Sequence, residues 1–254
     1  MAYVYLYDAS WEGLLTCVFR AFETGEWPQA VLEEENAQIA FGQTPLHVAA
    51  DMEKARRVER GILRNLGSAL HQKAWTVFLS GDPNKSTILY RYLCTAFRTG
   101  RGIYNALAHD DVLAMDQLEL QTTHEAQKLY GFVRFSRMEN GVFYGKITPK
   151  NNVLPLLMPF FADRFSDQPL LLYDAVHHLA GVYDLREWYL IETAGIHLPD
   201  LAGDELTYRR MWKLFYKTIS IAERENPKLR RSNMPKRYWP NMTEFDPPGR
   251  DSAG

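Results

Sequence analysis

The spacing of apolar residues changes within the stretch Gly131-Phe-Val-Arg-Phe-Ser-Arg-Met-Glu-Asn-Gly-Val-Phe-Tyr-Gly-Lys-Ile147, where a period of two replaces a helical period. Two alternating segments, Phe132–Ser136 and Val142–Ile147, flank the tripeptide Glu139-Asn-Gly141. An Asn-Gly pair tolerates the positive φ angles that a tight turn between antiparallel strands requires. The sequence therefore predicts a β-hairpin here, and with it a β-sheet in the second half of the chain.

The segments before this hairpin have a mainly helical period. Helices are expected over residues 11–23, 52–67, 69–79, 85–98 and about 108–130, and a short strand over residues 3–7. Asp8 and Ser10 offer side-chain oxygens that can cap the first of these helices. Residues 37–50 fit either a pair of strands or irregular edge structure.

The segments after the hairpin combine one helix with further strands. A helix is expected over residues 149–165, and strands over residues 170–173, 177–183 and 187–191. This order predicts an α+β fold in which a helical N-terminal half packs on an antiparallel sheet, with a basic C-terminal helix and tail. We expect a single domain over residues 1–245 and a flexible polar tail over residues 246–254.

The composition is that of a globular protein with a substantial core. The chain has 254 residues, of which 46% are hydrophobic, and its net charge is −2. The N-terminus lacks the features of a signal peptide, and no apolar run is long enough to span a bilayer. Two cysteines, Cys17 and Cys94, are too few for a disulfide framework or a cysteine metal site, and buried free thiols are expected. We expect a soluble cytoplasmic protein without a cofactor or a metal.

Positive charge is concentrated in one C-terminal stretch, Tyr208–Trp239. It contains ten lysines and arginines and only two acids, Glu223 and Glu225, so its net charge is +8 and the rest of the chain sums to −10. At a helical pitch, its first half places aromatic and aliphatic residues on one side and a basic row on the other. Pro227 ends this expected helix and leaves a basic tail that finishes in Lys236-Arg-Tyr-Trp239.

A basic row beside exposed aromatic rings suits a nucleic acid. The cations replace condensed counterions on the phosphates, and the rings offer a surface on which bases can stack. We therefore expect DNA, either single-stranded or damaged, to contact nine residues: Arg210, Lys213, Lys217, Arg230, Arg231, Lys236, Arg237, Tyr238 and Trp239. The alternative is a solvated helix face whose tail lies on the acidic body of the same protein.

Candidate chemistry elsewhere in the chain favours structural roles. Adjacent residues on a strand point to opposite faces, so His177 and His178 cannot easily bind one metal, although Asp174 is near in sequence. Asp8 closes a strand and opens a helix, a position that suits catalysis by topology but suits a helix cap better. The stretch Gly81–Ser86 lacks the glycine before the lysine of a phosphate loop. No catalytic residue is predicted.

Six stretches together resemble a bacterial family of unknown function that is described as acting in DNA metabolism or DNA repair. They are Tyr7–Phe19, Asp51–Val58, Leu129–Phe135, Tyr144–Pro149, Phe161–Phe165 and Met234–Trp239. Proteins of this family are usually encoded beside a radical SAM protein, and some are fused to a uracil-DNA glycosylase domain. The resemblance implies a radical SAM protein as partner. This chain is expected to be the stand-alone form, without glycosylase activity, and the family supplies no catalytic residues.

Three functions follow from these observations. The first is a DNA-binding accessory protein that acts with the radical SAM partner in DNA repair or modification. The second is a scaffold whose basic tail docks on an acidic patch of that partner, without contacting DNA. The third is an enzyme acting on a damaged nucleotide, with carboxylates such as Asp8 and Asp174 brought together by the fold.

Overall fold

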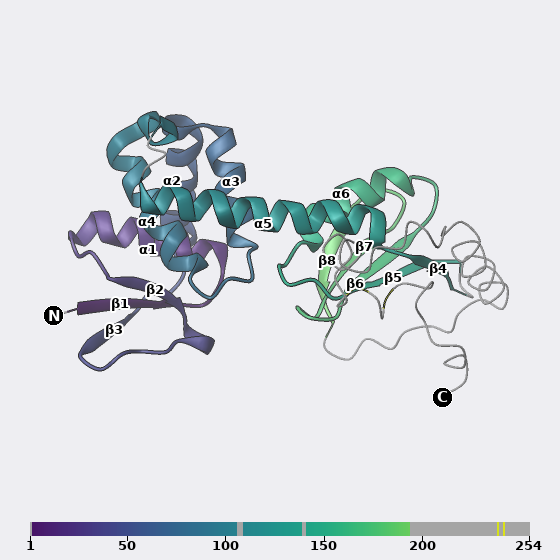
Figure 1. Cartoon of the computed structure of the whole chain (residues 1–254), viewed down its shortest axis with the longest axis horizontal. Helices are drawn as coiled ribbons and strands as arrows, with labels where there is room; N and C mark the ends of the chain where they lie inside the picture. Colours follow the sequence, from purple (N-terminus) through teal and green to yellow (C-terminus); the bar gives the residue numbers. More distant parts are fainter. Residues whose placement is uncertain (1, 106–108, 139–140, 194–237, 239–240, 242–254) are drawn as a thin grey trace, which may run out of the picture. The chain divides into compact units, whose positions relative to one another are not determined.

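The chain forms two compact units. A computed structural model describes residues 2–105, 109–138, 141–193, 238 and 241 (Figure 1). The first unit comprises Met1–Thr123 and the second His124–Gly254, and each has its own hydrophobic core. The boundary falls within the long helix α5 (Asp110–Phe132). The expectation of one domain over residues 1–245 stays a prediction, and the structure adds that the buried apolar residues form two separate clusters.

A three-stranded parallel sheet lies in the first unit. Strand β1 (Ala2–Tyr7) is central, with β2 (Ala30–Glu33) on one side and β3 (Gln43–His47) on the other. Residues Val4–Tyr7 are almost fully buried, as is typical of a parallel strand that is covered on both faces. The strand expected over residues 3–7 is confirmed, and residues 37–50 contain one strand. Strand β2 was not predicted, so the N-terminal half is less purely helical than expected.

The helices of the first unit lie close to their predicted bounds. They are α1 (Trp11–Thr24), α2 (Met52–Gly61) with a π-helical continuation (Ile62–Leu66), α3 (Ser68–Phe78), α4 (Lys85–Thr99) and the first half of α5. Short 3₁₀ segments are η1 (Glu34–Asn36) and η3 (Gly100–Asn105). Both cysteines are buried as expected, and burial raises the pKa of each thiol to about 12. Neither thiol is therefore ionised near neutral pH.

A buried hydrogen bond joins the sheet to α4. The hydroxyl of Tyr7, at the end of β1, lies 2.8 Å from Oγ of Ser86 in the first turn of α4. Burial raises the pKa of Tyr7, so its hydroxyl stays protonated and can take part in this bond. We expect Tyr7→Phe to lower the free energy of unfolding by about 1–2 kcal/mol, because Ser86 loses its partner.

Chemical denaturation followed by circular dichroism measures this change. Tyr3→Phe is the matched control, because Tyr3 belongs to the same strand and its ring is only partly buried. The control is expected to change the free energy of unfolding by less than about 0.5 kcal/mol. Equal effects of the two substitutions would show that the Tyr7–Ser86 bond contributes nothing.

The second unit contains a five-stranded mixed sheet. Its strands are β4 (Phe135–Arg137), β5 (Phe143–Ile147), β6 (Leu170–Asp174), β7 (Leu179–Tyr183) and β8 (Trp188–Glu192), in spatial order β4-β5-β6-β7-β8. Three neighbouring pairs are antiparallel, whereas β5 and β6 are parallel. The α+β class is confirmed, and the expectation of a purely antiparallel sheet is corrected. Helix α6 (Leu154–Arg164) connects β5 to β6, and such a helical crossover returns the chain in the same direction.

The predicted hairpin is present between β4 and β5. Ser136 pairs with Tyr144, and Gly141 adopts a φ of 83°, which a glycine accepts without strain. Strand β4 is shorter than expected because α5 continues to Phe132. Among the described residues, no helix combines the length and the apolar composition needed to cross a membrane.

Candidate functional site

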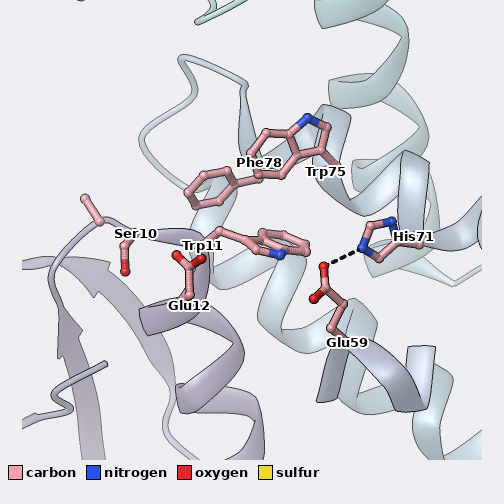
Figure 2. Close-up of a pocket in the computed structure, with 8 residues that line it drawn as sticks. Ser10, Trp11, Glu12, Glu59, His71, Trp75 and Phe78 are labelled. Carbon is pink, nitrogen blue, oxygen red and sulfur yellow. Dashed lines mark hydrogen bonds and ion pairs between the residues drawn. The ribbon is translucent and has the colours of Figure 1, made fainter. Parts of the chain in front are cut away.

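A pocket of about 530 Å³ lies at the carboxyl end of β1 in the first unit (Figure 2). We call it the Trp11 pocket. The loop after β1, the start of α1, α2 and α3 contribute its eight lining residues, which are Ala9, Ser10, Trp11, Glu12, Glu59, His71, Trp75 and Phe78. The carboxyl ends of parallel strands are where ligands bind in many α/β proteins, so the location suits a binding site.

The loop that opens the pocket is held by local hydrogen bonds. The backbone N–H and the hydroxyl of Ser10 both donate to Oδ1 of Asp8, at 3.1 and 2.6 Å. Oγ of Ser10 in turn accepts from the N–H of Gly13 at 2.9 Å, so Ser10 is the N-cap of α1. Ala9 between them has a φ of 59°. Asp8 thus stabilises the turn before α1, whereas the cap itself is Ser10 and not Asp8. The turn leads directly into Trp11 and Glu12, which line the pocket.

Aromatic rings form the walls of the Trp11 pocket. The centroid of the Trp11 ring lies 5.5 Å from that of Trp75 and 5.3 Å from that of Phe78, both in edge-to-face geometry. Trp75 and Phe78 are stacked on each other, with 5.7 Å between their centroids. Figure 2 shows Trp11 between this stacked pair and the side chains of Glu12 and Glu59. The stacked rings therefore lie on one side of Trp11 and the two carboxylates on the other (Figure 2).

The acidic and imidazole side chains of the pocket are two carboxylates, Glu12 and Glu59, and the ring of His71. Nε2 of His71 lies 2.9 Å from Oε1 of Glu59, and both side chains are partly exposed. This pair joins α2 to α3 and fixes the ring of His71, which also packs edge-on against Trp11 at 6.2 Å. Sequence reasoning missed the pair, because His71 and Glu59 each look like solvent-facing residues of separate helices. No spacing rule relates positions on two different helices.

Asp174 and His177 form a second polar cluster, in the second unit. Oδ1 of the buried Asp174 accepts from the backbone N–H groups of Val176 and His177, and Oδ2 lies 2.7 Å from Nδ1 of His177. Both histidines of the pair lie in the turn between β6 and β7, so the strand predicted over 177–183 begins only at Leu179. His178 has a φ of 53°. The cluster is a side-chain-capped turn.

The carboxylates proposed for an enzyme have separate partners. Asp8 belongs to the first unit and is bonded to Ser10, whereas Asp174 belongs to the second and is bonded to His177. Within the described ranges, no group of three histidine, cysteine or acidic residues is arranged to hold a metal ion. In the part of the chain that the structure describes, Glu59 and His71 meet at the Trp11 pocket.

Tyr238 is the one predicted DNA-binding residue that the structure places. Its ring is 2% exposed in the core of the second unit, and its hydroxyl donates to Oε1 of Glu125. A ring in this position has no face open to a base, so the expected stacking role of Tyr238 is corrected. The other predicted contacts, Arg210, Lys213, Lys217, Arg230, Arg231, Lys236, Arg237 and Trp239, lie outside the described residues.

A second basic row lies on α2 and its continuation. Arg56, Arg57, Arg60 and Arg64 are all exposed. The guanidinium of Arg57 lies over the ring of Phe19, with 5.0 Å to its centroid. Glu53 and Glu59 are interleaved with these arginines in the sequence and dilute the positive charge. The net positive charge of this row is therefore smaller than that of the Tyr208–Trp239 stretch.

Comparison with known proteins identifies one family. A family model described as a domain of unknown function, DUF4130, matches residues 83–244, which is more than half of the chain. The match begins just before α4 and includes the whole mixed sheet, whereas every residue of the Trp11 pocket precedes it. No curated protein matches the chain. No solved structure matches it either.

Proposed function

Since the chain belongs to the DUF4130 family, whose shared domain has no known function, we propose a function from its own residues. The protein is a DNA-binding accessory protein that acts in DNA repair or DNA modification, with a radical SAM protein as partner. The observation that carries this proposal is the separation of charge, +8 in Tyr208–Trp239 against −10 in the rest of the chain. The partner is proposed on the sequence resemblance alone.

The basic stretch provides the phosphate contacts. Arg210, Lys213, Lys217, Arg230, Arg231, Lys236 and Arg237 supply seven cations, and each phosphate that they neutralise releases condensed counterions. Trp239 supplies a ring for stacking, a role that the buried Tyr238 leaves to it. The burial of Tyr238 supports the proposal in another way, because it attaches the end of the basic stretch to a folded unit.

Fluorescence anisotropy of a labelled single strand across a salt series tests the proposal. With seven phosphate contacts, the logarithm of the binding constant is expected to fall with the logarithm of salt concentration with a slope of about −5. A peptide nucleic acid of the same base sequence is the matched control, because its backbone carries no charge, and it is expected not to bind. Absence of DNA binding even at low salt would contradict the proposal.

Docking on an acidic protein surface is the second candidate, because the same charge separation favours it. In that case the chain would bind the radical SAM partner at moderate salt and would show no affinity for DNA. Co-purification of the two proteins, compared between native chain and a chain in which the basic tail is neutralised, separates this candidate from DNA binding.

A further inference from the structure

We propose that the Trp11 pocket binds a flat organic cation, with the dimensions and charge of an N-alkylated purine base. This inference goes beyond DNA binding, because it names a ligand class for a site that uses none of the basic residues of Tyr208–Trp239. Three features of the pocket carry it: the aromatic walls, the sign of the charged groups that line it, and a cation that already lies over one of its rings.

The aromatic walls provide the surface for a flat ring. The ring centroids of Trp11, Trp75 and Phe78 lie 5.3 to 5.7 Å apart. Trp11 meets the other two rings edge-to-face, and those two are stacked on each other. Trp11 is 8% exposed and belongs to the core of the first unit, so the partly exposed rings of Trp75 and Phe78 offer the surface to a ligand. A cation within about 6 Å of a ring centroid is attracted to the negative face of that ring. The volume of about 530 Å³ accommodates a group as large as a nucleoside.

The charged groups that line the pocket select a positive ligand. The lining contains the carboxylates of Glu12 and Glu59 and contains no lysine or arginine. The His71 ring next to Glu59 fixes the orientation of that carboxylate at 2.9 Å. Carboxylates attract the ring of a cationic base and repel phosphate, so the pocket suits the base alone and leaves the phosphates to other parts of the protein.

Phe78 already carries a cation on one face. Nζ of Lys85 lies 5.3 Å from the centroid of the Phe78 ring and 3.2 Å from Oε1 of Glu33. The arrangement of ring, ammonium group and carboxylate resembles the one that we propose for the ligand with Trp75 and Glu59. Lys85 does not itself line the pocket, so the contact shows only that the Phe78 ring can hold an ammonium group.

A titration with two nucleosides tests the inference. Tryptophan fluorescence of the full chain is measured at mildly acidic pH during addition of 7-methylguanosine, whose base keeps its N1 proton there and is a cation, and of guanosine, whose base is neutral. We expect 7-methylguanosine to bind at least about tenfold more tightly, which corresponds to the strength of a partly desolvated cation–π contact. Equal affinity for the two nucleosides would contradict the preference of the pocket for a cation. If neither nucleoside quenched the fluorescence, the proposal that the Trp11 pocket binds such a ligand would be wrong.

Two variants locate the binding. Glu59→Gln and Glu12→Gln are expected to lower the affinity for 7-methylguanosine severalfold without changing the affinity for guanosine. Glu53→Gln, an exposed position on α2 outside the lining, is the matched control and is expected to have no effect. An unchanged affinity in both pocket variants would place the bound nucleoside elsewhere. Because a nucleoside carries no phosphate, the result is independent of whether the basic stretch binds DNA.

Discussion

Replacing Glu125 by alanine is expected to lower the free energy of unfolding of the second unit by about 3–5 kcal/mol. Glu125 is 4% exposed, and its carboxylate accepts from the N–H of Lys150 at 2.9 Å, and from the N–H and Nδ2 of Asn151 at 2.7 and 2.6 Å. The hydroxyl of Tyr238 donates to the same carboxylate. Alanine removes the acceptor of all four bonds and leaves a cavity among buried donors.

The position of Glu125 explains why the effect should be large. It joins α5 to the turn that precedes α6 and to Tyr238, three segments that are far apart in the sequence. Chemical denaturation measures the change, with Asp163→Ala as the control, because Asp163 is an exposed acid on α6 and should change the free energy of unfolding by less than about 0.5 kcal/mol. Glu125→Gln retains one acceptor oxygen and is expected to fall between the two. A loss as small as that of the control would contradict a structural role for Glu125.

The elements with a regular local period could be predicted from the sequence. The hairpin between β4 and β5 follows from alternation and from Asn-Gly, and the apolar stripe of α1 follows from its helical spacing. Strand β2 could not be found, because it is only four residues long and only one of them, Val31, is buried. The direction of a strand also leaves no local signal. Strands β5 and β6 are parallel because α6 connects them as a crossover. The alternation of apolar residues within either strand does not indicate this direction.

The candidate site was less predictable than the fold. The cap on α1 follows from local side-chain chemistry, because Ser10 is one of the two residues that the sequence offers for it; Asp8, the other, supports Ser10 instead. The Glu59–His71 pair and the packing of Trp11 on Trp75 depend on how α1, α2 and α3 pack together. Tyr238 lies in a basic, polar stretch and so seemed to be exposed. It is buried because Glu125, 113 residues earlier in the chain, provides an acceptor inside the second core.

Replacing Arg230, Arg231, Lys236 and Arg237 together by alanine is expected to weaken single-stranded DNA binding about 100-fold at 0.1 M salt. Each phosphate contact on a single strand contributes about 0.7 to the salt slope, so the loss of four should reduce its magnitude from about 5 to about 2. Anisotropy across the same salt series measures both quantities. Tyr238 is kept in this variant, so the bond to Glu125 that attaches the stretch is retained.

The matched control removes the same amount of charge from the first unit of the chain. Arg56, Arg57, Arg60 and Arg64 are exposed on α2 and its continuation, and their replacement by alanine also lowers the net charge by four. If DNA responded only to total charge, the two variants would weaken binding equally. We expect a much smaller loss from the α2 variant, because Glu53 and Glu59 dilute that row. If the fourfold alanine variant of Arg230, Arg231, Lys236 and Arg237 kept the salt slope of the native chain, the basic stretch would not be the DNA-binding site. The net charge of +8 in that stretch would then favour docking on an acidic protein partner.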